Sequence, residues 1–269
     1  METYYGAQAS TLNFADPKAA DTINAWVKDK TKNKIDSIVN PPIDSSTKAI
    51  LVNAVYFKGK WTVPFNKSST TDRNFTASDS SESLVPMMQR GAKFSYLENS
   101  QFQAVRLPYG NDSASMYVFL PASSVLGMPK IDDFAASITQ AQWQSWLPQF
   151  RETEGTVVLP KFKVEYMTSL AEALKNSGMG IAFSDAANFS GISKMPLEIT
   201  DVVHKTYIET NEEGTEAAAV TGIFMGTTAV MPQQPPFYME MNRPFFYAIT
   251  DDKTGEIIFL GVMNKVDAQ

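Results

Sequence analysis

Cysteine is absent from this chain of 269 residues, and histidine occurs only once, as His204. The absence of cysteine excludes disulfides, thiolate metal sites and a cysteine nucleophile. A single histidine excludes a histidine-based zinc cluster and any catalytic scheme that needs two imidazoles. The signatures GxGxxG, GxxxxGK[ST] and GxSxG are missing as well. We therefore expect no cofactor, no bound metal and no enzymatic activity.

Positive charge and long apolar runs are also scarce. The formal net charge is −6 at neutral pH, which argues against nucleic acid or an anionic membrane as a partner. No window offers the roughly 20 apolar residues that span a bilayer. The opening METYYGAQAS lacks the basic and apolar regions of a secretion signal. What is present, 43% hydrophobic and 19% charged residues, is typical of a globular domain.

The spacing of apolar residues predicts strands with helices interspersed. Proline at a first helical position predicts a helix from Pro17. Thr139 with Gln142, and Ser169 with Glu172, read as the capping boxes of two further helices. The predicted strands are 48–61, 113–121, 155–165, 201–210 and the two arms of a hairpin over 245–263. Strands and helices do not alternate strictly, so the predicted class is α+β.

Two of these strands carry specific expectations. The segment 48–61, KAILVNAVYFKGKW, is apolar on both faces and is predicted to lie in the middle of a sheet. In 201–210, DVVHKTYIET, alternation places His204 beside Val202 on a buried face and Lys205 on a wetter one. No serine or cysteine motif is present for a histidine base to serve. The favoured interpretation of the histidine is therefore a hydrogen-bonded core residue.

The stretch NEEGTEAAAVTGIFMGTTAVMPQQPP, from Asn211 to Pro236, is too weakly apolar for a core element. Its glycines interrupt any long helix, and a structureless run of this length usually marks function or disorder. Alternation from Thr215 to Thr221 gathers small, uncharged side chains on one face and leaves Glu216 on the other. Such a face could enter between existing strands without burying bulk or charge. The segment is predicted to be a loop that can also become a strand.

Seven segments carry a resemblance to a known family. They are VNAVYFKGKW (52–61), LPYG (107–110), LPKF (159–162), FSGIS (189–193), VVHK (202–205), EEGTEAAA (212–219) and NRPFFYAI (242–249). In this order they resemble the serpins, and the match covers essentially the whole chain. The resemblance implies the serpin fold, with a large central mixed β-sheet, further sheets, surrounding helices and an exposed reactive loop at about 212–236.

The resemblance also implies a mechanism. In serpins a target protease cleaves the exposed loop as bait, and the loop then inserts as an extra strand into the central sheet. The protease is dragged away with its active site distorted. We therefore expect a serine-type endopeptidase inhibitor that acts by suicide inhibition as a monomer. An extracellular or periplasmic location would fit the family, although the sequence itself leaves the location open.

Site residues follow from the resemblance position by position. The implied hinge is Glu212, Glu213, Gly214, Thr215, Glu216, Ala217, Ala218 and Ala219. The implied shutter, at the centre of the sheet, is Asn53 with His204. The implied breach, at the top of the sheet, is Trp61 with an ion pair of Lys161 and Glu212. Gly214 is the expected pivot, because only glycine is free of Cβ cost in an unusual turn.

Counting along the hinge as in the family places the bait bond at Thr228-Ala229. The alternatives are Val230 and Met231, or Phe224 and Met225 for a chymotrypsin-like protease. No basic residue occurs between Lys205 and Arg243. A trypsin-like pocket, whose buried carboxylate needs a basic partner, is therefore disfavoured. The expected partner is an elastase-like or subtilisin-like serine protease.

Two rival interpretations stay open at this point. One is a non-inhibitory serpin-fold binding, chaperone or storage protein, although the inserting face carries neither proline nor charge. The other rests on what the family has upstream, because its domain begins with helices that have no counterpart here. We expect residues 1–269 to be a single serpin-like domain that lacks this N-terminal helical part. The chain would then be an inactive fragment, or another chain would supply the missing part.

Overall fold

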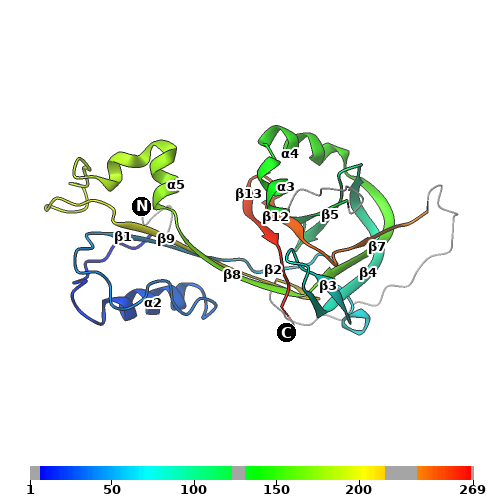
Figure 1. The fold of residues 1–269 in the computed structure, drawn as a ribbon, viewed down its shortest axis with the longest axis horizontal. Coiled ribbons are helices and arrows are strands. Elements are labelled where there is room, and N and C mark those ends of the chain that lie inside the picture. The colour runs from blue at the N-terminus through cyan, green and yellow to red at the C-terminus, as the bar shows by residue number, and fades with distance from the viewer. Residues whose placement is uncertain (1–6, 123–130, 216–234, 268–269) are drawn as a thin grey trace. The chain divides into compact units, whose positions relative to one another are not determined.

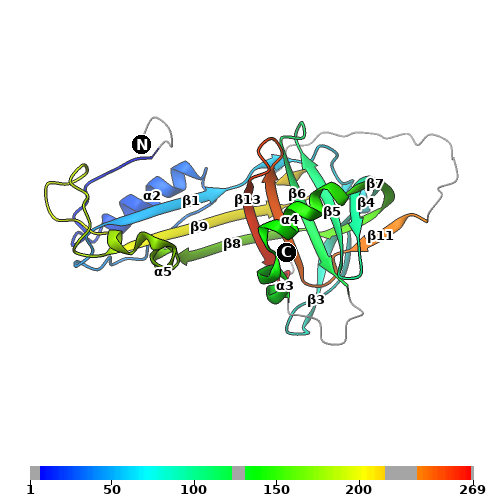
Figure 2. The same ribbon diagram turned by 90° about the horizontal axis from the view of Figure 1, so that it is seen from above.

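The chain forms two compact units, which are described separately (Figures 1 and 2). The computed structural model describes residues 7–122, 131–215 and 235–267. The first unit comprises Met1–Phe57 and Val164–Ile208, and the second comprises Lys58–Lys163 and Glu209–Gln269. No helix among the described residues is long and apolar enough to cross a membrane.

The first unit is built on a sheet with the strand order β1-β9-β8. Its elements are α2 (Ala19–Lys30), β1 (Ile50–Tyr56), β8 (Phe162–Ser169), α5 (Ala171–Leu174) and β9 (Asp201–Thr210). β1 and β9 run parallel, with Asn53 opposite His204. Val27 of α2 and Ile35 after it lie in one apolar cluster with Val203 and Tyr207 of β9. Helix α2 therefore covers one face of this sheet (Figure 1).

Several predictions for the first unit were inexact. Helix α2 begins at Ala19 rather than Pro17, because Asn13 to Lys18 form hydrogen-bonded turns before it. β1 is the edge strand of its described sheet rather than a central one, and Leu51 on it is 46% exposed. Ser169 is not a capping-box residue, since its hydroxyl donates to Asp201 at 2.5 Å. Helix α5 is correspondingly short.

The second unit is a larger, mostly antiparallel sheet. Its strand order is β11-β7-β4-β5-β6-β12-β13, and β3 also pairs with β4. The strands are β3 (Thr71–Thr76), β4 (Glu82–Glu98), β5 (Phe102–Tyr109), β6 (Ala114–Pro121), β7 (Arg151–Pro160), β11 (Phe237–Glu240), β12 (Phe245–Asp251) and β13 (Ile257–Met263). The predicted strand 113–121 and the hairpin over 245–263 are confirmed. The predicted strand 155–165 is in fact two strands, β7 and β8, separated at Lys161.

Helices α3 (Ile131–Ser137) and α4 (Gln140–Trp146) pack on this sheet, and their side chains join the aromatic residues of its strands in one core cluster. Trp143 of α4 packs edge-on against Tyr117 of β6, with ring centroids 5.5 Å apart. The predicted capping box of α4 is confirmed, because Thr139 and Gln142 exchange side-chain to backbone hydrogen bonds. Together the strands and helices confirm the α+β class.

Candidate functional site

The described residues on either side of the segment 216–234 are held in the second unit by two sets of contacts. We call residues 211–215, which include β10 (Gly214–Thr215), the N-terminal anchor. We call β11, Phe237–Glu240, the C-terminal anchor. The positions predicted for the bait bond and for the later part of the hinge lie outside the described residues. They are Glu216, Ala217, Ala218, Ala219, Phe224, Met225, Thr228, Ala229, Val230 and Met231.

Gly214 is fixed by a tight turn within the N-terminal anchor. Asn211 and Gly214 exchange two backbone hydrogen bonds, of 2.8 and 3.1 Å. The φ angle of Gly214 is +131°, which side chains rarely tolerate. A Cβ atom at Gly214 would lie 2.2 Å from the carbonyl oxygen of Gly59 and 2.6 Å from the nitrogen of Trp61. Both the backbone angle and the lack of space therefore require glycine here.

Trp61, predicted to lie near this point, binds the anchor twice. Its backbone N–H donates to the carbonyl of Glu213 at 2.9 Å, and its indole Nε1–H donates to the carbonyl of Asn211 at 2.9 Å. The indole stacks on Tyr109 at a centroid distance of 4.3 Å. Phe65 N–H donates to the carbonyl of Glu212 at 2.8 Å. The segment 61–65 thus supplies donors to three successive carbonyls of the anchor.

The structure places Glu212 and Lys161 together, as the sequence led us to expect. Lys161 Nζ lies 3.2 Å from Glu212 Oε2, and the Thr70 hydroxyl donates to Oε1 at 2.8 Å. The Glu212 side chain is 8% exposed, so this is a mostly buried ion pair. Burial opposes ionisation of the carboxyl, but hydrogen bonds from its own backbone, Thr70 and Lys161 outweigh it and lower the pKa of Glu212.

Sequence reasoning missed a second ion pair in the same anchor. Lys67 Nζ lies 2.6 Å from Glu213 Oε1, and the hydrogen bond and charge of that glutamate raise the pKa of Lys67. Among the described residues, the other carboxylate oxygen of Glu213 is buried and has no hydrogen-bond partner. Asn66 and Lys67 carry no pattern in the sequence that would have pointed to this contact. Only the path of the chain after Trp61 brings them there.

The pairing of β10 sets the direction in which the chain leaves the N-terminal anchor. Gly214 pairs with Lys60, and Thr215 pairs with Gly59, in an antiparallel ladder with β2 (Gly59–Lys60). β2 follows the end of β1 after only two residues, Phe57 and Lys58. The chain that leaves the anchor therefore starts in strand conformation, in the direction opposite to that of β2.

Asn53 and His204 are brought together in the first unit. Asn53 Oδ1 lies 2.9 Å from His204 Nδ1, and the two residues are register partners on β1 and β9. Burial lowers the pKa of His204, which favours the neutral ring. Both side chains are more exposed than predicted, since the described residues leave this face of the sheet partly open.

The faces of β9 differ from the prediction. Lys205 was expected on the wetter face, yet it is only 9% exposed. Its ammonium donates to the carbonyl of Ser37 at 2.9 Å and pairs with Glu165 at 2.6 Å. The physical reason is that helix α2 and the segment after it cover this face. The alkyl stem of a lysine can pack there while its charge reaches a partner.

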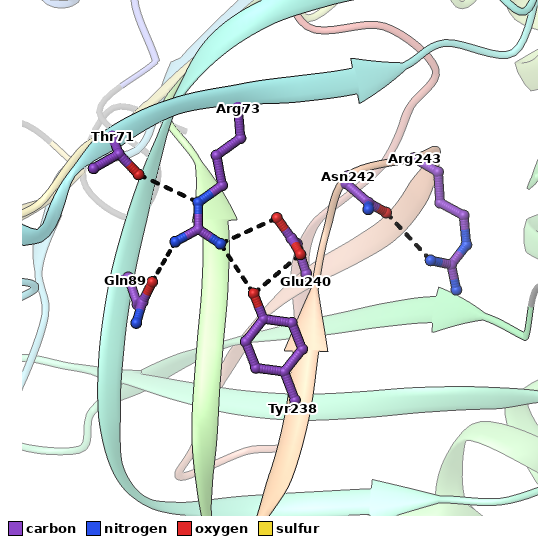
Figure 3. Close-up of polar contacts among 7 residues, drawn as sticks. All are labelled: Thr71, Arg73, Gln89, Tyr238, Glu240, Asn242 and Arg243. Atoms are coloured by element: carbon purple, nitrogen blue, oxygen red, sulfur yellow. Dashed lines mark hydrogen bonds and ion pairs between the residues drawn. The ribbon is translucent and has the colours of Figure 1, made fainter.

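Arg73 binds the side chains on one face of the C-terminal anchor (Figure 3). Its guanidinium donates to Tyr238 Oη at 2.9 Å and to Glu240 Oε1 at 3.2 Å, and it also binds Thr71 and Gln89. Tyr238 Oη in turn donates to Glu240 Oε2 at 3.0 Å. One side chain thereby ties β11 to β3 and β4, in addition to the backbone pairing of β11 with β7.

The opposite face of the C-terminal anchor is apolar. The Phe237 ring stacks on Tyr96 with centroids 3.8 Å apart and an interplanar angle of 6°. It lies directly over Gly155 of β7, where a Cβ atom would meet the ring at 2.2 Å. Met239, on the same face, is fully buried. β11 is thus held by a ring that fits over a glycine.

No group of three or more His, Asp or Glu side chains in the described part of the chain could hold a metal ion. The site therefore consists of hydrogen bonds, ion pairs and ring contacts at two anchors, and of the Asn53–His204 pair.

Comparisons with known proteins give a consistent result. The family model described as Serpin (serine protease inhibitor) matches residues 1–266. The chain is 35% identical to Iripin-5 of Ixodes ricinus, covering 98% of this chain and 67% of that protein. It is 36% identical to a serine protease inhibitor of Cyanea capillata, covering 89% and 63%. The native structure of the thermophilic serpin tengpin has a TM-score of 0.85 at 31% identity, covering 98% and 67%. The chain thus spans about two thirds of the length of each.

Proposed function

The chain belongs to the serpin family, whose members are generally protease inhibitors rather than enzymes, and from that premise we propose that it inhibits a serine protease by strand insertion. The single observation that carries the proposal is β10. Gly214 and Thr215 of the hinge are already paired as a strand, antiparallel to β2, and the inserting face that follows them, with Ala217, Ala219 and Thr221, has the small side chains that an inserted strand needs.

The register of β10 supports a path for the proposed inserted strand. Gly214 pairs with Lys60 and Thr215 with Gly59. The same register, continued along the chain, would bring Thr221 beside Asn53. The new strand would lie between β1 and β9, which are now direct neighbours in parallel pairing. Insertion would replace this one parallel ladder by two antiparallel ones, which are slightly more stable per residue.

The Asn53–His204 contact would have to open for the strand to enter. It joins β1 and β9 near the middle of their ladder. A hydrogen bond between neutral groups contributes about 1 kcal/mol net, enough to affect the rate of opening but not to prevent it. We therefore assign to this pair the role of a contact that keeps β1 and β9 together until the strand inserts.

Cleavage would leave the protease attached to the moving end of the hinge. Fourteen residue steps from Gly214 to Thr228, at about 3.3 Å each, correspond to roughly 46 Å of travel. This distance is comparable to the diameter of a domain, so a bound protease would have to move bodily. With small or apolar residues at Thr228 to Met231, the proposed target has a small apolar pocket, as elastase and subtilisin do.

The test is to incubate the protein with elastase, subtilisin or trypsin. We expect an SDS-resistant complex with elastase or subtilisin, and a released C-terminal peptide whose mass places one cut between Thr228 and Met231. Thr215→Arg should convert the protein into a plain substrate, because an arginine on the inserting face must be buried or must halt the strand. Glu216→Arg, which adds the same side chain on the opposite face, should still form the complex.

Cleavage at the expected bond without any complex would contradict the inhibitory mechanism and favour a non-inhibitory serpin. Equal inhibition by the parent and by Thr215→Arg would contradict strand insertion. A complex with trypsin alone would overturn the assignment of the target class.

A further inference from the structure

A continuous row of side chains connects the two anchors within the second unit. It begins at Trp61, whose indole donates to the carbonyl of Asn211 in the N-terminal anchor. Phe65 lies edge-on to Trp61, with ring centroids 6.2 Å apart. The guanidinium of Arg90 on β4 lies 4.9 Å from the centroid of Phe65. This half of the row contacts the N-terminal anchor through Trp61.

The second half of the row runs from Arg90 to the C-terminal anchor. The same guanidinium lies 4.7 Å from the centroid of Phe94, four residues further along β4 and on the same face. Phe94 is edge-on to Phe237 of β11 at 5.9 Å, and Phe237 stacks on Tyr96. Arg90 is thus the one member of the row that touches both halves.

The surroundings of Arg90 are unusual for a cation. Its only hydrogen-bond acceptor among the described residues is the carbonyl of Val63, and its Nε is buried without a partner there. No carboxylate of the described part is paired with it. Burial lowers the pKa of Arg90 to about 10. A guanidinium in this position depends on the two ring faces, since cation–π attraction is stronger where water is excluded.

We propose that Arg90 is a positioning residue that links the two anchors, so that displacement of β11 loosens the residues around Gly214. The physical reason is close packing. A shift of Phe237 removes the support of Phe94, and Phe94 is one of the two rings that hold the guanidinium in place. The guanidinium in turn holds Val63 and Phe65, and the N–H of Phe65 binds the carbonyl of Glu212.

The link would matter for the function proposed above, because it would couple the packing of β11 to the packing around Gly214. It does not depend on that function, however. The contacts join two described parts of one unit, and they can be tested without any protease. A protein that inhibits nothing could still show the coupling, and an active inhibitor could lack it.

The experiment displaces β11 and measures hydrogen exchange at both anchors. Gly155→Ala introduces a methyl group 2.2 Å from the Phe237 ring. Gly91→Ala on the neighbouring strand is the matched control, because its Cβ would meet only Thr156 Oγ1, at 3.8 Å. We expect Gly155→Ala to speed exchange in peptides over 235–241 and also over 59–67, by about fivefold or more, the lower end of typical coupling between sites. Gly91→Ala should change neither.

The same measurement in an Arg90→Lys background isolates the link. Lysine keeps the charge but lacks the plane that stacks between two rings. In this background Gly155→Ala should still speed exchange over 235–241, whereas the additional effect over 59–67 should disappear. Arg90→Met serves as a second background, should lysine disturb folding.

Two outcomes would overturn the proposal. One is that Gly155→Ala speeds exchange over 235–241 alone in the parent protein. The other is that its effect over 59–67 persists unchanged with Lys or Met at position 90. In either case the aromatic row would be local packing, and the two anchors would open independently.

Discussion

The N-terminal anchor is held almost entirely by polar groups, whereas the C-terminal anchor has a stacked ring on one face and, besides its backbone pairing with β7, an arginine on the other. At 211–215, three backbone carbonyls accept hydrogen bonds from the segment 61–65 and two glutamates pair with lysines. At Phe237–Glu240, a phenylalanine stacks over a glycine, and Arg73 binds one face. The first arrangement can be released step by step, because each polar group can exchange its partner for water. The ring contacts of the second are lost together when the Phe237 ring moves.

This difference fits the roles that we propose for the two ends. In the proposed mechanism the inserted strand continues the register of β10, so contacts that water can replace would let the residues around Gly214 rearrange while the strand forms. β11 would remain with the second unit after cleavage, and a packed ring is suited to hold it. The comparison leads to predictions about which anchor opens first after a substitution or a change in pH.

The largest effect is expected for Gly214→Ala. The alanine must adopt a φ near +131° and also clashes with Gly59. Strain and overpacking together should lower the free energy of unfolding by about 3 kcal/mol or more. Urea denaturation measures this change, and hydrogen exchange over 59–67 should rise in parallel.

Gly255→Ala is the control for strain alone. Its φ is +73° and no atom lies within 4 Å of the added methyl group. We expect a loss of about 1–2 kcal/mol there. Equal losses for the two variants would show that the close approach of Gly214 to β2 is unimportant.

A smaller effect is expected from removing the lysine of either ion pair. Lys161→Met leaves the Glu212 carboxylate buried with only Thr70 and the backbone, and it should destabilise the N-terminal anchor by about 1.5–3 kcal/mol. Lys67→Met should have a comparable effect, because it removes the ammonium at 2.6 Å from the Glu213 carboxylate, whose side chain is only 10% exposed. Hydrogen exchange of the Phe65 amide reports both. A negligible effect of Lys67→Met would mean that water reaches the Glu213 carboxylate once the lysine is removed.

These two lysines also show which contacts could be predicted from the sequence and which could not. The Lys161–Glu212 and Asn53–His204 contacts were reached through a resemblance, because family motifs fix which positions meet. Lys67–Glu213 joins residues 146 apart with no motif on either side. Alternation grouped the residues of β9 by face correctly, but it could not tell which face helix α2 covers, so Lys205 was placed on the wrong one.

The contacts of Arg73 and Arg90 could not be predicted from the sequence for a related reason. Each is a lone arginine in a strand that looks ordinary by its own pattern. Its partners come from parts of the chain that are distant in sequence, such as β11 for Arg73 and the segment 63–65 for Arg90. The pairing of strands, rather than the composition of any one strand, creates both environments.

The smallest effect is expected from mild acid, which should loosen the N-terminal anchor before the C-terminal one. The pKa of Glu212 is lower in the folded protein than its ordinary value of 4.5. Its ionised form therefore contributes stability that is fully present above about pH 4.5 and is lost as the pH falls through the lowered, folded-state pKa. Hydrogen exchange over 59–67, corrected for the intrinsic effect of pH, should rise in this range more than exchange over 235–241 does. Glu212→Gln, which cannot ionise, should remove the pH dependence over 59–67. Parallel loosening of both anchors in this variant would assign the acid response to another group.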